Sequence, residues 1–197
     1  MLNRTKIYSA VIAGALVSAA AASAQETAAA FFSAIFNQPG AASSSGRPQE
    51  NPVPRETVNY SSRFAPGTIV ISTKERRMYY VLGNGQAIRY GVGVGRPGFT
   101  WAGTKAVTRK AEWPDWTPPP QMLKRRPDLP RHMKGGPDNP LGARALYLGS
   151  SLYRIHGSNE PWTIGQAVSS GCIRMTNDDV TDLYGRVRVG TRVVVVN

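Results

Sequence analysis

One cysteine and one histidine upstream of it are the residues of this sequence best suited to covalent chemistry. Cys172 is the single cysteine of the chain and lies in the stretch 169–172, while His156 lies in the stretch 155–158. A cysteine thiol is a strong nucleophile when a neighbouring imidazole takes its proton, and it needs no metal. The imidazole can also hold the thiol largely as a thiolate at neutral pH. The pair therefore predicts nucleophilic attack on a carbonyl group.

Cys172 taken alone has two other interpretations, a small buried apolar residue or a partner in an intermolecular disulfide. Its neighbours favour the nucleophile. Gly171 permits a tight turn and the close approach of a substrate, and the amide N–H groups of Gly171 and Cys172 could converge on one point. Such an arrangement forms an oxyanion hole, in which fixed donors stabilise the negative oxygen of a tetrahedral acyl intermediate.

Three polar side chains flank the predicted nucleophile and are candidates for substrate binding. Ser169 and Ser170 precede Gly171, and Arg174 comes two residues after Cys172. In an extended segment, Arg174 would point to the same side as Cys172. Arg174 could bind a substrate carboxylate or brace the loop, and the sequence leaves both interpretations open.

The elements that must position these residues are mainly strands. From Pro66 onward, short apolar runs are separated by turn residues, and the stretch 83–85, Gly-Asn-Gly, predicts a hairpin. His156 falls at the end of one predicted strand, so a strand, a loop and a return can bring it beside Cys172. We predict a mainly β, sandwich-like domain with strands at 68–72, 77–82, 86–92, 145–148, 152–155 and 192–196.

One short helix is predicted directly after the cysteine segment. Thr176 can cap it through its hydroxyl, and Asp179 stands three residues later in the first turn. Asp178 and Asp179 lie where the helix dipole favours negative charge, so we interpret them as helix-starting residues rather than as a catalytic pair. The helix should end near 189–190, with an apolar face formed by Val180, Leu183 and Val187.

The first residues of the chain predict export. Two basic residues, an apolar alanine-rich run and the small-residue site 22–24 follow one another in the order of a secretory signal peptide. We expect residues 1–24 to be removed, so that the mature chain begins near Gln25 and has no membrane-spanning segment. Residues 25–60 are rich in small and polar residues without a strand pattern and are predicted to be a flexible tether.

The charge of the chain is strongly positive, with 24 Lys and Arg against 12 Asp and Glu and a formal net charge of +12. Loss of Arg4 and Lys6 with the signal peptide would leave +10. Such a field attracts polyanions. Because an exported protein meets anionic polymers of the cell surface before it meets DNA, we do not expect a nucleic acid as partner. The basic run 124–126 is predicted to be a solvated loop or one that faces such a polymer.

Three further motifs give weak or open signals. The glycine-rich stretch 91–95 lacks the last glycine of a dinucleotide-binding motif, so we interpret its glycines as sites of close strand packing. His132 has no cluster of cysteines or carboxylates to join, and we therefore expect no metal and no cofactor. The aromatic and proline-rich stretch 113–120 could border a substrate site or be a packed surface loop.

The motifs around Cys172 and His156 resemble those of a known family, the L,D-transpeptidase catalytic domain or YkuD family of bacteria. The resemblance covers roughly 66–197, and the order and spacing of its motifs are specific. The stretches that carry it are TIVISTKERRMYYV, YGVGVGRPGFTWAGT, WPDWTPPPQM, GPDNPLGARALYLG, IHGS, SSGCIRMTNDD and the terminal VGTRVVVV.

The resemblance implies a cell-wall enzyme of the periplasm in which Cys172 is the nucleophile and His156 is the general base and later the acid. It also implies that the backbone carbonyl of Gly157 orients the imidazole in place of a triad carboxylate. The donor would be a tetrapeptide stem of peptidoglycan, attacked at the carbonyl before its terminal D-alanine. The acceptor would be an amine of another stem or of an outer-membrane or wall-anchored protein. One departure is Ser170, where many members of the family carry a histidine.

Two competing functions remain beside transfer. A non-catalytic peptidoglycan-binding module would account for the positive charge but would leave the pair of Cys172 and His156 without a role. A hydrolase, either a carboxypeptidase or an amidase that cleaves cross-links, would use the same nucleophile and base with water as the acceptor. The sequence does not identify the acceptor.

Overall fold

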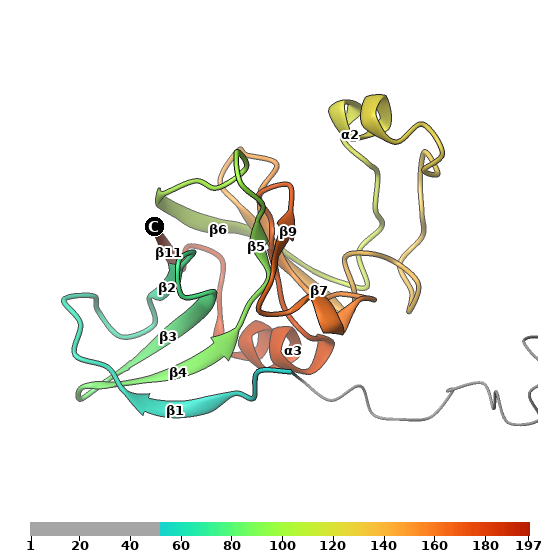
Figure 1. Ribbon diagram of the computed structural model, residues 1–197. Coiled ribbons are helices and arrows are strands. Elements are labelled where there is room, and N and C mark those ends of the chain that lie inside the picture. Colours follow the sequence, from blue (N-terminus) through green and yellow to red (C-terminus); the bar gives the residue numbers. More distant parts are fainter. Residues whose placement is uncertain (1–51) are drawn as a thin grey trace, which may run out of the picture. The chain divides into compact units, whose positions relative to one another are not determined.

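The computed structural model describes residues 52–197. The predicted signal peptide at 1–24, and the predicted tether as far as residue 51, lie outside these residues. The predicted mainly β class is confirmed, because most of the elements of the described part are strands (Figure 1). Their bounds are β1 Glu56–Asn59, β2 Ile69–Ser72, β3 Arg77–Gly83, β4 Gln86–Gly91, β5 Val94–Gly95, β6 Gly103–Glu112, β7 Arg144–Leu148, β8 Arg154–His156, β9 Ala167–Ser169, β10 Ile173–Arg174 and β11 Arg192–Val196.

Within the described residues, nine strands form one sheet in the order β1-β4-β3-β2-β11-β6-β7-β8-β10, and β5 pairs with β9 separately. The long strand β6 belongs to both halves of the large sheet. Its first residues, from Gly103 to Ala106, pair with β11, and its later residues, from Val107 to Glu112, pair with β7, with a shift in register between Val107 and Arg109. This shared strand joins the half built on β2, β3 and β4 to the half that carries His156.

The hairpin predicted at 83–85 joins β3 to β4. Gly83, Asn84 and Gly85 all have positive φ, which glycine and asparagine tolerate better than other residues. The neighbouring strand β2 pairs with β3 on one side and with β11 on the other. Since β2 is buried along its whole length, it forms the centre of this half of the sheet.

Helix α3, Asn177–Arg186, follows the cysteine segment as predicted (Figure 1). The hydroxyl of Thr176 accepts a hydrogen bond from the Asp179 amide at 3.2 Å, so the predicted N-cap is confirmed. The predicted apolar face packs into the core with strands from both halves of the sheet. The helix ends at Arg186 rather than near 189–190, because Val187 has left the helical conformation.

Several elements differ from the prediction. Strand β1 lies inside the segment predicted as a tether, which is therefore wrong over its last residues: Glu56–Asn59 pairs antiparallel with β4. Strand β6 is not among the predicted strands. The basic run 124–126 was expected to be a loop, but its first two residues end a short helix, α2 Pro120–Arg125, at the tip of a long excursion between β6 and β7 (Figure 1). Among residues 52–197, no helix is long and apolar enough to cross a membrane.

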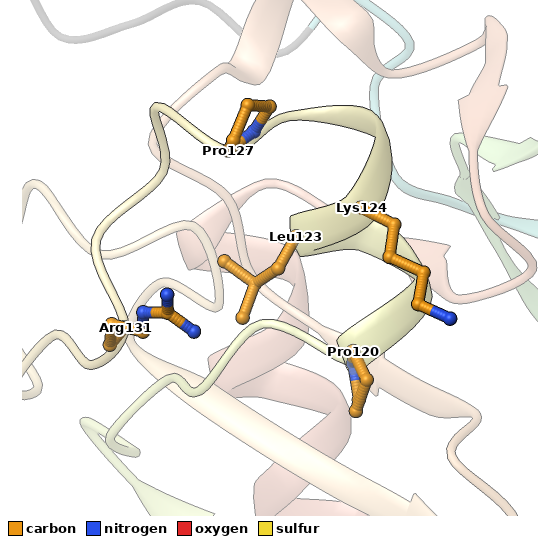
Figure 2. A pocket seen from close by; sticks show the side chains of 5 residues that line it. All are labelled: Pro120, Leu123, Lys124, Pro127 and Arg131. Carbon is orange, nitrogen blue, oxygen red and sulfur yellow. The ribbon is translucent and has the colours of Figure 1, made fainter.

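Helix α2 lines one side of an open, mostly apolar pocket of about 420 Å³. Figure 2 shows the side chains of Leu123 and Arg131 turned toward one another across it. Its lining residues are Pro120, Leu123, Lys124, Pro127 and Arg131. The excursion is fastened at its base by two hydrogen bonds of 2.8 Å between the backbones of Trp116 and Met133. The stretch 113–120 is thus divided, with Trp116 buried and Trp113 exposed.

Candidate active site

The pairing of two short strands brings the segment of Cys172 beside that of His156. Strand β10 runs parallel to β8, with Arg174 opposite His156 and Ile173 opposite Ile155. Because side chains alternate along a strand, the two isoleucines enter the core while His156 and Arg174 share the other face. Cys172 comes immediately before β10, and its Sγ lies 3.7 Å from the carbonyl oxygen of Leu152, just before β8.

The imidazole of His156 is fixed by the backbone of the next residue. Its Nδ1 lies 2.6 Å from the carbonyl oxygen of Gly157, the contact that the family resemblance implies. A carbonyl oxygen only accepts, so Nδ1 carries the proton and, in the neutral ring, Nε2 is free to accept one. Burial and the positive charge of Arg174 lower the pKa of His156 to about 3. The ring is therefore neutral across the physiological range, and its Nε2 carries a free lone pair.

The thiol of Cys172 is also held in its neutral form. Burial raises its pKa above the ordinary value, and hydrogen bonding to Arg154 together with the charges of Arg154 and Arg174 opposes this only in part. Both shifts favour the neutral forms, a thiol and a neutral imidazole, whereas the sequence indicated that an imidazole can hold the thiol largely as a thiolate. The physical reason is that desolvation penalises both charged forms.

Ser169 fixes the loop that carries the cysteine. Its Oγ donates to the carbonyl oxygen of Cys172 at 2.6 Å and accepts from the amide of Gly171 at 3.1 Å. The Gly171 amide therefore already has an acceptor, which alters the expectation that the amides of Gly171 and Cys172 converge on one oxyanion. Among residues 52–197, the Cys172 amide has no such acceptor and is the better candidate donor.

An aromatic pair lies against Gly171. Trp101 and Tyr153 stack with ring centroids 4.7 Å apart, and the indole Nε1 of Trp101 donates to the carbonyl oxygen of Gly171 at 2.8 Å. Gly171 has a φ of +108°, and a Cβ there would lie 2.6 Å from the ring of Tyr153. The turn and the close approach both require glycine at this position. Neither aromatic residue was singled out from the sequence.

Arg174 braces a loop instead of pointing freely into the site. Its Nη1 lies 2.9 Å from a carboxylate oxygen of Glu160 and 3.5 Å from the hydroxyl of Thr163. Both partners belong to the loop around the 3-10 helix η1, Pro161–Thr163, that follows His156. Of the two interpretations open from the sequence, this geometry favours bracing, since the guanidinium already has a carboxylate partner.

Asn177, the first residue of α3, connects the helix to the segment before β7 and to the loop that follows His156. Its side-chain oxygen accepts from the amide of Ala143 at 2.9 Å and from the amide of Ser158 at 3.3 Å. A Cβ on Gly157 would collide with this oxygen, so only glycine fits beside it. Asn177 lies within a motif noted in the sequence, but its role depends on contacts between distant segments.

The remaining sequence signals lie elsewhere or have simple packing roles. His132 lies 3.3 Å from the hydroxyl of Thr117 and 3.6 Å from a carboxylate oxygen of Asp115, within the excursion that carries α2. No cluster of three or more metal-ligating side chains occurs in the described part of the chain. In the glycine-rich stretch, a Cβ on Gly95 would collide with the backbone of Phe99, as expected for close packing.

Comparison with known proteins identifies the domain. The family model named L,D-transpeptidase catalytic domain, YkuD, matches residues 66–195. The protein named Probable L,D-transpeptidase ErfK/SrfK, from Escherichia coli strain K12, is 41% identical over 138 residues, which is 66% of this chain and 44% of that protein. The chain therefore spans less than half the length of this curated relative.

Solved structures agree on the fold. An L,D-transpeptidase from Mycobacterium smegmatis superposes with a TM-score of 0.52 at 20% identity, over 66% of this chain and 58% of that chain. A structure from Brucella melitensis, named a probable carnitine operon oxidoreductase, is 43% identical with a TM-score of 0.50, over 75% of this chain and 96% of that chain. That name gives a different chemistry from the family model and from the curated relative.

Proposed function

Because this chain belongs to the family of the L,D-transpeptidase catalytic domain, we propose that it is an exported acyltransferase that forms peptide cross-links in peptidoglycan or links a protein to it. Cys172 is the nucleophile and His156 the general base. The observation that carries the assignment is the 2.6 Å contact between His156 Nδ1 and the carbonyl oxygen of Gly157. This contact leaves Nε2 of the neutral imidazole without a proton. His156 ends β8, which pairs with β10, and β10 begins directly after Cys172.

The first half-reaction forms an acyl-enzyme. The sulfur of Cys172 attacks the carbonyl carbon that precedes the terminal D-alanine of a tetrapeptide stem, while His156 takes the thiol proton. The Cys172 amide donates to the oxygen that becomes negative in the tetrahedral intermediate. The C–N bond then breaks, the imidazolium gives its proton to the leaving amine, and D-alanine departs from a thioester. An imidazole with so low a pKa is a weak base, but its conjugate acid passes the proton on readily.

The second half-reaction transfers the acyl group. An acceptor amine attacks the thioester, His156 takes the proton from that amine, and the C–S bond breaks to restore the thiol. The amine belongs to a diaminopimelate side chain of a second stem, or to an outer-membrane or wall-anchored protein. Water in place of the amine would give hydrolysis from the same intermediate, so the acceptor decides between transfer and cleavage.

The location follows from the sequence. Residues 1–24 have the order of a secretory signal peptide, and we place the mature enzyme in the periplasm or cell wall, where its substrate lies. A single cysteine is compatible with this oxidising location, because it has no partner within the chain with which to form a disulfide.

Intact mass spectrometry after incubation with a carbapenem tests the proposal. Carbapenems are β-lactams that acylate members of the family which this chain resembles. We expect a stable adduct on the wild-type protein and none on Cys172→Ala, with circular dichroism showing that both are folded. An adduct on neither protein would favour a non-catalytic peptidoglycan-binding module, with Cys172 as a structural thiol. Muropeptide analysis with and without an acceptor amine then separates transfer from hydrolysis.

A further inference from the structure

A second basic residue, far from Arg174 in sequence, lies directly against the loop that precedes the nucleophile. Arg96 follows β5, and its backbone amide donates to the carbonyl oxygen of Ser169 at 3.0 Å. Its guanidinium Nη1 donates to the hydroxyl of Ser170 at 3.3 Å. Ser170 is the position at which the family resemblance leads one to expect a histidine. The guanidinium of Arg96 is thus held two residues before Cys172.

The turn after Arg96 fixes this guanidinium further. The amide of Phe99 donates to the carbonyl oxygen of Arg96 at 2.9 Å, and the ring of Phe99 lies 4.1 Å from the guanidinium carbon. The backbone of Phe99 also lies close to Gly171, where a Cβ would be 3.2 Å from the Phe99 carbonyl oxygen. The turn is therefore packed against the residue that precedes the nucleophile.

A second guanidinium reaches the same ring from the excursion between β6 and β7. Arg125, the last residue of α2, has its guanidinium carbon 5.5 Å from the centroid of Phe99. Two arginines from segments far apart in the sequence thus each contact the ring of Phe99. An aromatic face attracts a cation but does not neutralise it, so both retain the capacity to bind an anion.

Neither arginine has an acidic partner in the described part of the chain. The ion pairs among residues 52–197 include those of Arg174 with Glu160 and of Arg126 with Asp128, but none involves Arg96 or Arg125. Two guanidinium groups that contact one ring and have no acidic partner are suited to a carboxylate, because each offers parallel N–H donors.

We propose that Arg96 and Arg125 bind the terminal carboxylate of the donor peptide, which is the carboxylate of the residue released when Cys172 is acylated. This inference rests on the proposed function. In the donor, that carboxylate belongs to the residue next to the attacked carbonyl, within about 4 Å along the chain. A carboxylate-binding subsite must therefore adjoin the loop that carries the nucleophile, as Arg96 does. The two arginines would make the enzyme selective for a peptide with a free carboxyl terminus.

The test measures kcat/KM for release of the terminal residue from a matched pair of donors, a tetrapeptide stem with a free terminal carboxylate and the same stem with a terminal amide. We expect the wild-type enzyme to lose about 10- to 100-fold on the amide, the size of one charge-assisted contact. Arg96→Gln should lose a similar factor on the carboxylate donor and nothing further on the amide. Arg125→Gln, a change at an exposed position, should behave in the same direction with a smaller loss.

Arg126→Gln is the matched control, because it removes the same charge from the residue next to Arg125 while Arg126 pairs with Asp128. It should retain the selectivity of the wild type. Equal rates on the two donors, or an equal loss on both donors in Arg96→Gln, would overturn the inference while leaving turnover by Cys172 intact. A second result would also overturn it. If the loss of kcat/KM in Arg96→Gln disappears only when the side-chain carboxylate of the donor's diaminopimelate is amidated, the arginines bind that carboxylate and not the terminal one. Release from neither donor would overturn the proposed function as well.

Discussion

At the scale of single residues, the candidate site depends on backbone groups where many nucleophilic sites use charged side chains. His156 is oriented by the carbonyl oxygen of its neighbour Gly157. The hydroxyl of Ser169 accepts from the amide of Gly171 and donates to the carbonyl oxygen of Cys172. These contacts position the reacting groups without adding a negative charge beside the imidazole. Burial, followed by the positive charge of Arg174, lowers the pKa of the ring to about 3, so the imidazole is neutral at any pH near neutrality.

This buried imidazole should make the stability of the fold depend on pH. The pKa of His156 is about 3 in the folded protein, against about 6.5 for an unfolded histidine. Between these values the unfolded chain binds a proton that the native protein does not. The contribution is therefore fully present above about pH 6.5 and is lost as the pH falls toward 3, by up to about 1.4 kcal/mol per pH unit. Urea unfolding of the wild type at several pH values measures this slope.

The matched variants are His156→Gln and His132→Gln. The first should flatten the slope between about pH 6 and pH 4, and the second should keep it, because His132 is exposed within the excursion that carries α2. Equal slopes in His156→Gln and the wild type would show that other groups cause the loss of stability in acid. The comparison uses slopes, so a constant cost of burying the glutamine does not affect it.

At the scale of elements, the start of α3 connects three segments of the site. Thr176 caps the helix, while the side-chain oxygen of Asn177 accepts from the amide of Ala143, just before β7, and from the amide of Ser158, in the loop after His156. Helix formation, loop position and the location of the imidazole are thus coupled through the first turn of one helix.

Asn177→Ala should therefore lower both stability and the rate of acylation. Two loop amides would lose their acceptor, at a cost of about 1–3 kcal/mol for a buried donor without a partner. The midpoint temperature of thermal unfolding should fall by several degrees. Acylation of Cys172 by a carbapenem should slow, because the loop that carries Gly157 loses a hydrogen-bond acceptor. Asn177→Asp keeps the oxygen acceptor and should retain most of both properties. If the alanine and aspartate variants behave alike, the oxygen of Asn177 does not organise the site.

The elements also differ in how far the sequence could predict them. The β3–β4 hairpin and the Thr176 cap were found because their signals are local. Strand β1 was missed because its residues are mostly exposed and its existence depends on pairing with β4, about thirty residues away in the register. Strands β5, β9 and β10 have only two or three residues, so they lack a periodic pattern and are defined by their partners.

The same limit applied to the site. The spacing around Cys172 pointed to the segment of the proposed nucleophile and to the candidate base, because those motifs are local. The contact of Arg96 with Ser170 and that of Trp101 with Gly171 join residues about seventy positions apart. Each of those residues read alone is an ordinary arginine or tryptophan, and only the tertiary fold gives it a place beside the cysteine.

At the scale of the whole molecule, the dominant property is the formal net charge of +12. Several of its arginines are used internally, as in the pairs of Arg174 with Glu160 and of Arg186 with Asp182. The excess remains on the surface, including the excursion that carries Lys124, Arg125 and Arg131, which the solvent reaches. A field of this kind acts over about a Debye length, whereas the chemistry proposed for the half-buried Cys172 and the buried His156 takes place within the domain.

Salt should therefore separate attraction to the cell wall from catalysis. Screening shortens the range of the surface field from about 30 Å at 0.01 M salt to about 3 Å at 1 M. We expect the fraction of the mature protein that co-sediments with isolated peptidoglycan to fall several-fold over this range. The rate at which a carbapenem acylates Cys172 should change less than about twofold, because the thiol and the imidazole are shielded by protein. If binding to peptidoglycan is unchanged at 1 M salt, it depends on specific contacts and not on the net charge. If the acylation rate falls as much as binding does, the surface charge also affects the reaction of Cys172.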